Sequence, residues 1–259
     1  MTLIKNKRGV YCLDTTIGCN SGTIKNEKGC YDDCYAARFS KRRGWDFGKT
    51  IARNFESREH KKNTIKKIND IEMPFVRIGC TGDPSENWQH TVNICEQISV
   101  CNNQLSVFGV LPKTIVIITK HFKNLTDDQL KTISELDICV NTSVSALDNE
   151  RLLINRLTQY NRLKKYCKSV LRIVSCDFNL NNRAGQKLEA LQQKLFSNEN
   201  VLDTVLRVSK ENKYVLAGII NIKETKFLGK KCYASVYNKK TYLGYCSKCK
   251  EMCGVNFKQ

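Results

Sequence analysis

The stretch "TIVIITKHFKNLTDDQLKTISELDICVNTSVS" (Thr114–Ser145) decides the fold class of this chain. It begins and ends with β-branched, apolar runs, at Thr114–Lys120 and Asp137–Ser145, which are typical of buried strands. Between them, Thr126 precedes acidic residues and then Leu and Ile at helical spacing, so the sequence predicts a capped helix over Thr126–Leu136. A strand, a helix and a second strand in this order predict a βαβ unit with parallel strands.

The same alternation of strands and helices continues in both directions from this unit. The predicted strands are Val10–Cys19, Pro74–Cys80, Thr114–Lys120, Asp137–Ser145, Val170–Asp177 and Lys213–Ile222. The predicted helices are Tyr35–Asp70, Glu86–Asn103, Thr126–Leu136, Asn149–Tyr166 and Arg183–Phe196. Six repeats predict an α/β protein with a partial (β/α)6 TIM-like barrel, because a closed eightfold barrel normally needs more chain. We assign residues 1–222 to this barrel and residues 223–259 to a small Cys-rich, metal-binding C-terminal extension.

Charge and hydropathy restrict the classes of function. The 259 residues carry 43 Lys and Arg against 25 Asp and Glu, a net charge of +18. Such an excess favours a polyanionic partner, most simply nucleic acid, although an AT-rich genome would also enrich Lys without functional meaning. No apolar run follows the basic N-terminal residues, and no stretch approaches the roughly 18 apolar residues of a membrane helix. We therefore expect a cytoplasmic protein that does not bind membranes.

The chain contains 14 cysteines, which are too clustered for a disulfide scaffold. Without a secretion signal we expect reduced thiols, and clustered thiols then indicate a metal site or catalysis. The first cluster is Cys19, Cys30 and Cys34. Three thiolates with an open fourth position suit an iron–sulfur cluster, whereas structural zinc would need a fourth ligand, which Cys12 could supply. Spacing alone leaves cluster and zinc as equal alternatives, with unliganded thiols as a third.

A second group of thiols lies near the C-terminus. The segment "YCSKCKEMCGV" contains Cys246, Cys249 and Cys253, and Cys232 precedes it. Four cysteines with a C-x2-C-x3-C core match either structural zinc or an auxiliary iron–sulfur cluster. Lysines flank the segment, so it could also hold phosphates as a zinc knuckle does.

The predicted strand ends carry polar side chains, at the edge where barrels hold their chemistry. Alternation along "CVNTSVS" places Cys139, Asn141, Ser143 and Ser145 on one face, which a purely structural barrel would fill with aliphatic residues. Ordinary polar strand ends are the alternative. The basic run Ala37–Trp45 includes Phe and Trp, which favours a surface for stacking and phosphate binding over a merely solvated face.

In these features the chain resembles the radical SAM superfamily, in particular phage-type members related to spore photoproduct lyase. The resemblance is carried by Gly18-Cys19, Gly29-Cys30 and Cys34-Tyr35-Ala36. "RIGCTGDPS" (Arg77–Ser85) falls where the family has its glycine-rich second-strand motif, and "LRIVSCDFN" (Leu171–Asn179) is similar to a later strand that bears Arg and Ser. The usual family loop is C-x3-C-x2-C, and its third cysteine would fall at Ala37 here, so Cys19 must be the third ligand.

The resemblance implies that Cys19, Cys30 and Cys34 hold a [4Fe–4S] cluster that binds S-adenosylmethionine (SAM). The cluster would cleave SAM to a 5′-deoxyadenosyl radical, with electrons from a donor such as flavodoxin or ferredoxin. Cys80 and Cys176 would donate hydrogen atoms, although free cysteines more often pack as small apolar residues. The residues implied to contact SAM are Thr81, Asp83, Asn141, Ser143, Ser145, Arg172 and Ser175. The ligands of a second [4Fe–4S] cluster or a zinc ion would be Cys232, Cys246, Cys249 and Cys253.

The leading interpretation is a monomeric enzyme that abstracts hydrogen from a nucleic-acid base or modified base, in repair or in base remodelling. The base would be single-stranded or flipped from a duplex, and DNA is favoured over RNA. One alternative is a radical SAM enzyme that modifies peptides, against which the positive charge counts. The other is a non-catalytic, zinc-dependent nucleic-acid-binding protein, which predicts zinc at both thiol groups and no affinity for SAM.

Overall fold

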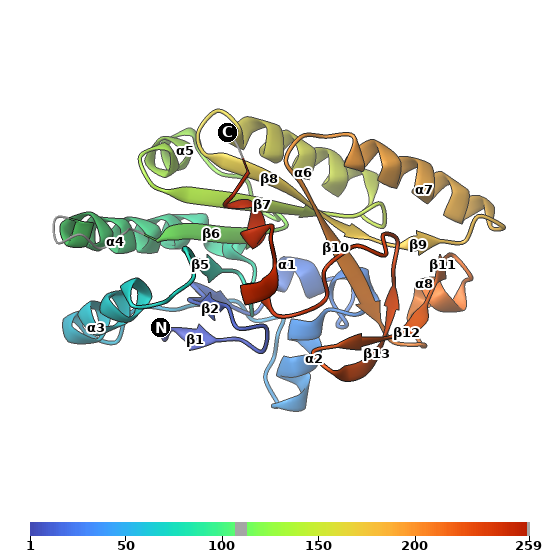
Figure 1. Cartoon of the computed structure of the whole chain (residues 1–259), viewed down its shortest axis with the longest axis horizontal. Coiled ribbons are helices and arrows are strands. Elements are labelled where there is room, and N and C mark those ends of the chain that lie inside the picture. The colour runs from blue at the N-terminus through green and yellow to red at the C-terminus, as the bar shows by residue number, and fades with distance from the viewer. Residues whose placement is uncertain (107–112, 258–259) are drawn as a thin grey trace.

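A nine-stranded, mostly parallel sheet forms the centre of the computed structural model, which describes residues 1–106 and 113–257 (Figure 1). Strands β2, β5, β6, β7, β8 and β10 are parallel neighbours in that order, and β1, β13 and β12 are antiparallel additions at the two edges. The α/β class predicted from the sequence is confirmed. The strands are β1 (Ile4–Lys5), β2 (Tyr11–Cys12), β5 (Phe75–Ile78), β6 (Thr114–Thr119), β7 (Ile138–Val144), β8 (Lys168–Ser175), β10 (Val201–Val208), β12 (Lys223–Phe227) and β13 (Lys230–Ser235).

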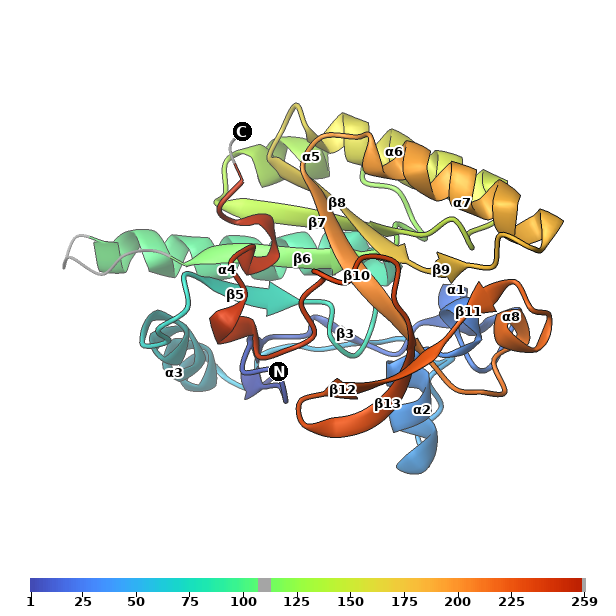
Figure 2. The ribbon, with the colours of Figure 1, turned by 45° about the vertical axis from the view of Figure 1, so that its right-hand side comes forward.

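Helices cover one face of this sheet, and the C-terminal segment lies on the opposite face (Figures 1 and 2). Two small sheets, β3 (Thr16–Ile17) with β4 (Ile51–Ala52) and β9 (Asp177–Phe178) with β11 (Ile220–Asn221), lie beside the main sheet. In the part of the chain that the structure describes, no helix is long and apolar enough to cross a membrane. The helices are α1 (Asn20–Thr23), α2 (Tyr35–Arg42), α3 (Arg58–Asn69), α4 (Trp88–Ser106), α5 (Asp127–Ser134), α6 (Glu150–Leu163), α7 (Arg183–Phe196) and α8 (Lys213–Leu216).

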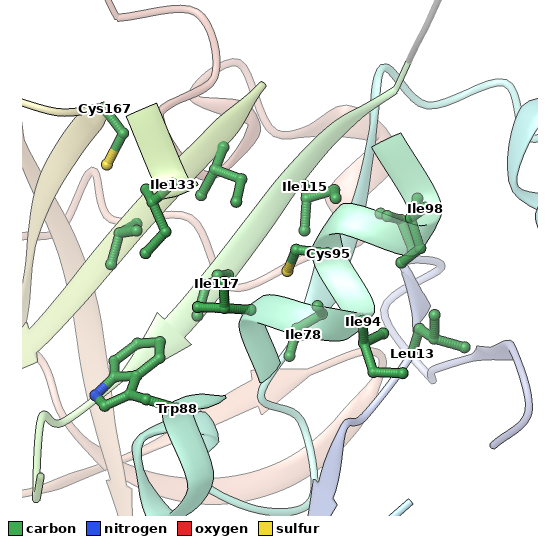
Figure 3. Packing of buried hydrophobic residues seen from close by; sticks show 14 of the residues in the cluster. Leu13, Ile78, Trp88, Ile94, Cys95, Ile98, Ile115, Ile117, Ile133 and Cys167 are labelled. Atoms are coloured by element: carbon green, nitrogen blue, oxygen red, sulfur yellow. The ribbon is translucent and has the colours of Figure 1, made fainter. Parts of the chain in front are cut away.

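The larger hydrophobic core lies between the sheet and its helices (Figure 3). Ile115 and Ile117 of β6 pack with Ile94 and Ile98 of α4, and all four are fully buried. Each such side chain stabilises the fold by about 1.5–3 kcal/mol through its removal from water. Cys95 lies in the same cluster, and burial raises the pKa of its thiol to about 12. This cysteine therefore acts as a small core residue rather than as a ligand.

Alternation along β7 divides its side chains between the two faces of the sheet. The Cys139 thiol and the Asn141 amide both donate to the carbonyl oxygen of Cys253, at 3.8 and 2.9 Å. Thr142, the residue after Asn141, bonds instead to His121, 3.0 Å away on the helix side. The predicted common face of Cys139 and Asn141 is confirmed, and the C-terminal segment covers it.

The sixth parallel strand is β10, so the predicted strand at Lys213–Ile222 is wrong. That stretch forms α8 and the short strand β11 instead. The Asn212 side chain accepts a hydrogen bond from the backbone amide of Tyr214 at 3.0 Å and so caps α8. Gly218, after the helix, has a left-handed conformation with φ +63°. A side-chain cap and a glycine stop are sufficient to form a short helix in a locally apolar run.

The predicted helix Tyr35–Asp70 is wrong in its length, because α2 ends at Arg42 and α3 begins at Arg58. Gly44 lies between them with φ +70°, a conformation that an L side chain rarely adopts. The predicted strand Val10–Cys19 is likewise divided into β2 and β3.

Candidate functional site

The first cysteine group forms one loop around two glycines. A Cβ atom at Gly22 would lie 2.7 Å from Cys19 Sγ and 3.6 Å from Cys30 Sγ. A Cβ atom at Gly29 would lie 3.6 Å from Cys34 Sγ. Cys34 packs in the same small cluster as Cys19. Burial raises the pKa of Cys30, and the charge of Cys34 adds to the effect. The structure therefore brings the three predicted ligands together, packed closely against two glycines that have no Cβ atom to displace them.

This loop contacts the carboxyl ends of several strands of the main sheet. Gly18 forms a parallel bridge with Gly82, which follows β5. Tyr31 lies over the end of β6, where its hydroxyl accepts a hydrogen bond from Lys120 Nζ at 2.5 Å and its ring lies 4.2 Å from the same ammonium. The carboxyl ends of parallel strands are where α/β barrels hold their reactive groups.

Asp33 ties the loop to the carboxyl end of β10. Its buried carboxylate accepts hydrogen bonds from Ser209 N at 2.8 Å, Ser209 Oγ at 3.2 Å and Asn212 Nδ2 at 3.0 Å. Arg38 of α2 completes the arrangement with an ion pair at 2.8 Å. Hydrogen bonds to a charged group contribute about 1.5–3 kcal/mol. Asp33 therefore fixes a loop that has little apolar surface of its own.

A buried group of charged side chains lies directly beneath Tyr31. Asp148 and Arg156 form an ion pair at 2.5 Å with both side chains almost fully buried. Burial lowers the pKa of Lys120 and raises the pKa of Tyr31. Burial also opposes ionisation of Asp148, but Lys120 and Arg156 outweigh it and hold the pKa of that carboxyl below its ordinary value. Two cations therefore accompany one carboxylate, and of the charges that act on Cys30, Lys120 opposes the rise in its pKa most strongly.

Buried acidic groups surround the sulfur of Cys19. Its thiol donates to Glu86 Oε1 at 3.7 Å, and the same oxygen accepts the amide of Ser21 at 2.7 Å. Burial raises the pKa of Cys19, and the charge of Asp83 adds to the effect. A thiol in such surroundings stays protonated unless a metal ion or cluster binds it as thiolate.

Two of the predicted SAM-contacting residues are engaged within the protein. Thr81 donates from its amide and its hydroxyl to Asp14, at 2.9 and 2.6 Å. Asp83 accepts hydrogen bonds from the hydroxyls of Ser85 and Thr119, each at 2.6 Å. Both residues shape the loop after β5. Asp14, which sequence reasoning missed, lies two residues after β2 and within the predicted strand Val10–Cys19. An aspartate inside that apolar run was the available signal.

The two cysteines predicted to donate hydrogen atoms lie in structural positions. Cys80 forms a disulfide with Cys12 on the face of the sheet that the C-terminal segment covers, which we call the inner face. Neither cysteine therefore has a free thiol, contrary to the expectation of reduced cysteines. Cys176 is fully buried, its pKa is raised by burial, and its amide donates to Gln192 at 2.8 Å. Ser175 donates to Asp203 at 2.6 Å.

The remaining predicted SAM-contacting residues lie along β7 and β8. Asn141 bonds the C-terminal segment, as described above, and Arg172 Nη1 donates to its side-chain oxygen at 3.4 Å. Ser143 is the register partner of Arg172. The Ser145 hydroxyl donates to the carbonyl of Val174 at 2.7 Å. These residues therefore lie deeper on the sheet than the cysteine loop.

The second cysteine group surrounds a cavity of about 90 Å³ on the inner face of the sheet. Cys246, Cys249 and Cys253 line this cavity together with strands β5, β8 and β10. Cys232 lies on β13 and is not part of the lining. The structure therefore brings together three of the four predicted ligands.

A basic surface with aromatic side chains adjoins the cysteine loop. On α2 and just after it, the Arg43 guanidinium stacks 4.3 Å from the Phe39 ring and 5.7 Å from Trp45, and both aromatic residues are exposed. Helix α2 lies beside the hairpin β12–β13 in both views (Figures 1 and 2). That hairpin pairs Lys226 with Lys231 across its two strands. Lys231 is also paired with Glu224 at 2.9 Å, so the hairpin carries both signs of charge.

The chain matches no protein-family model, no curated protein and no solved structure. Among the residues that the structure describes, no three His, Cys, Asp or Glu side chains could share one metal ion. Thiolates that bind different iron atoms of a cluster need not converge on one ion.

Proposed function

We propose that this chain is a radical SAM iron–sulfur enzyme that acts on nucleic acid. The observation that carries the proposal is the gathering of Cys19, Cys30 and Cys34, from one loop, at the carboxyl ends of parallel strands. The backbone of Gly22 packs directly against two of the sulfur atoms, where any Cβ atom would collide with Cys19 Sγ. Three thiols presented by one loop fit a [4Fe–4S] cluster with one open iron.

A cluster in this position would supply reductive cleavage of SAM to a 5′-deoxyadenosyl radical. The chain's own residues hold the loop in place. Glu86 accepts the Ser21 amide, and Asp33 accepts hydrogen bonds from the loop that follows β10. Lys120 places a positive charge beside Cys30, where it opposes the rise in the pKa that burial causes. That cation would favour the thiolate needed for iron binding.

The nucleic-acid substrate is supported by charge and by its distribution. The net charge is +18, and exposed aromatic side chains accompany the cations of α2. Cations that neutralise phosphates and rings that stack on bases are the usual components of a single-strand surface. The two features lie beside the cysteine loop, because α2 begins directly after Cys34.

The finer parts of the proposal follow from this assignment. The six parallel strands from β2 to β10 would form a partial (β/α)6 barrel, with the cluster at the carboxyl ends of its strands. The enzyme would be a cytoplasmic monomer that takes electrons from a flavodoxin or a ferredoxin. Its substrate would be a DNA base or modified base, presented single-stranded or flipped.

Iron, sulfide and zinc analysis of anaerobically purified protein tests the proposal. We expect iron and sulfide in the wild type and a loss of about four iron atoms in each of C19A, C30A and C34A. The matched control is C95A, which removes a buried core thiol remote from the loop and should retain all iron. Reductant-dependent formation of 5′-deoxyadenosine from SAM should follow the iron content. Zinc alone at both thiol groups, without SAM cleavage, would contradict the proposal and support a non-catalytic binding protein.

A further inference from the structure

The cavity on the inner face of the sheet is lined by four arginines from separate parts of the chain. Arg8 precedes β2, Arg77 lies on β5, Arg172 on β8 and Arg207 on β10. None of the four guanidinium groups forms an ion pair with a carboxylate of the described residues. Four cations around one small cavity are costly unless an anion accompanies them.

The contacts of the guanidinium groups leave most of their donors unused. Arg8 Nε donates to the carbonyl of Gly244 at 3.0 Å, and Arg77 contacts only the sulfur of Cys80, at 3.2 Å from Nε and from Nη2. Arg172 Nη1 donates to Asn141 Oδ1 at 3.4 Å, and the same guanidinium also bonds the sulfur of Cys253. Arg207 lies over the ring of Phe227 at 3.9 Å. Each guanidinium carries five N–H donors. The cavity therefore presents many donors and few acceptors.

Two acidic residues also line the cavity, and neither neutralises the arginines. Asp203 accepts hydrogen bonds from the hydroxyls of Ser175 and Thr241. Burial raises the pKa of Glu251, against the opposing charge of Arg172. Four arginines against two carboxylates leave the net charge of the lining positive. Burial lowers the pKa of both Arg172 and Arg207, and the charge of Arg8 adds to the effect on each.

We propose that this cavity binds a phosphate group, with a nucleic-acid strand as its source. The cavity volume of about 90 Å³ is sufficient for a phosphate group. Planar guanidinium forks match phosphate oxygens in pairs. Tyr242 at the wall would offer its ring to the sugar or base of the same nucleotide.

The position of the cavity connects it to the cysteine loop. Tyr35, the residue after Cys34, donates its hydroxyl to the carbonyl of Cys80 and lies close enough to Arg77 and Arg207 to feel their charges. A phosphate in the cavity would therefore hold a strand beside the cluster loop. This inference rests on the proposed function only for the source of the phosphate, because the arginine cavity exists without it.

The test is calorimetric binding of inorganic phosphate and of a 5′-phosphorylated, single-stranded decanucleotide to the full chain. We expect R172Q and R207Q each to weaken both ligands about tenfold or more, as expected for loss of a charged hydrogen bond. The matched control R183Q removes an exposed arginine on α7 and should change either affinity less than about twofold. For the oligonucleotide, each cavity variant should lower the slope of log K against log salt by about 0.7.

R207K preserves the charge but not the fork, so we expect intermediate affinity, and unchanged thermal midpoints would show that the variants fold. If R207Q bound phosphate as tightly as R183Q does, and the oligonucleotide as tightly as R183Q does, the inference would be overturned and the proposed function would stand. Binding of phosphate without the oligonucleotide would support the cavity and assign it to a small phosphorylated molecule, against the nucleic-acid part of the proposed function. Absence of phosphate binding, together with loss of iron in R172Q, would overturn the inference, because the anion would then be a cluster on the nearby cysteines.

Discussion

The two cysteine groups share a backbone feature but lie in opposite surroundings. Tyr31 and Asp32, directly after Cys30, have φ values of 56° and 63°, and Met252 and Cys253 have φ values of 43° and 56°. Non-glycine residues in this left-handed region cost about 1–3 kcal/mol each and persist only where other contacts hold them. Each group therefore depends on contacts from the rest of the fold.

Those contacts differ in kind between the two groups. The N-terminal loop is held by ionisable side chains, above all Asp33 and the group around Lys120. The C-terminal segment packs on apolar residues of the sheet, such as Phe75 and Val116, and is held by the Asn141 amide. The comparison shows that identical ligand types can be placed by electrostatics at one end of a sheet and by hydrophobic packing on its face.

The largest expected effect tests the close packing of Gly22 against the N-terminal thiols. We expect G22A to lower SAM cleavage at least ~100-fold, because its Cβ would lie 2.7 Å from Cys19 Sγ and displace a ligand. Iron at the loop should fall in parallel. The control is N20A, in the same short helix at an exposed position. Normal iron content and normal activity in G22A would contradict the placement of the cluster.

The second prediction uses pH to separate the two regions. His121 lies next to Lys120 at the loop end of the sheet, and burial lowers its pKa to about 4 from an ordinary value of 6.5. The neutral form is therefore favoured in the folded state, and its stabilisation is complete above pH 6.5 and lost as the pH falls toward 4. We expect this loss to reach about 3 kcal/mol in the free energy of unfolding.

Denaturant unfolding at several pH values checks this expectation. The H121Q variant lacks the titrating ring, so its stability should change less between pH 6.5 and 4 than that of the wild type. A comparable variant of the other region, N141A, should retain the full wild-type pH dependence. Identical pH profiles for the wild type and H121Q would show that His121 does not set the sensitivity of the loop end.

The third prediction concerns the anchor of the N-terminal loop. We expect D33A to destabilise the fold by about 2 kcal/mol, because the amide of Ser209 and the side chain of Asn212 lose a charged acceptor. Hydrogen exchange should rise in residues 19–34 and stay unchanged at the C-terminal segment. D32A, at the neighbouring and less buried carboxylate, is the matched control. If hydrogen exchange in D33A rose equally in residues 19–34 and at the C-terminal segment, a local anchoring role for Asp33 would be contradicted.

The smallest effect is expected at the anchor of the C-terminal segment. N141A should cost about 1 kcal/mol, the usual contribution of a hydrogen bond between neutral groups. The apolar contacts of the segment remain, so its exchange protection should fall only slightly. Release of the whole segment in N141A would show that the amide, and not hydrophobic packing, holds it.

The sequence determined the repeated pattern of the fold. Apolar, β-branched runs at Thr114–Lys120 and Asp137–Ser145 fixed two neighbouring parallel strands, because burial on both faces demands such composition. Alternation along the second run correctly placed Cys139 and Asn141 on one face. The three N-terminal cysteines were recognisable as one group by their spacing along a single loop.

Only the tertiary structure decided the rest, because the contacts join residues far apart in the chain. It placed Asp33 against Ser209 and replaced the strand predicted at Lys213–Ile222 with β10. It also assembled the arginine cavity from four separate segments and left Cys232 outside it. Local sequence encodes periodicity and capping, whereas long-range pairing depends on which surfaces the folded chain buries together.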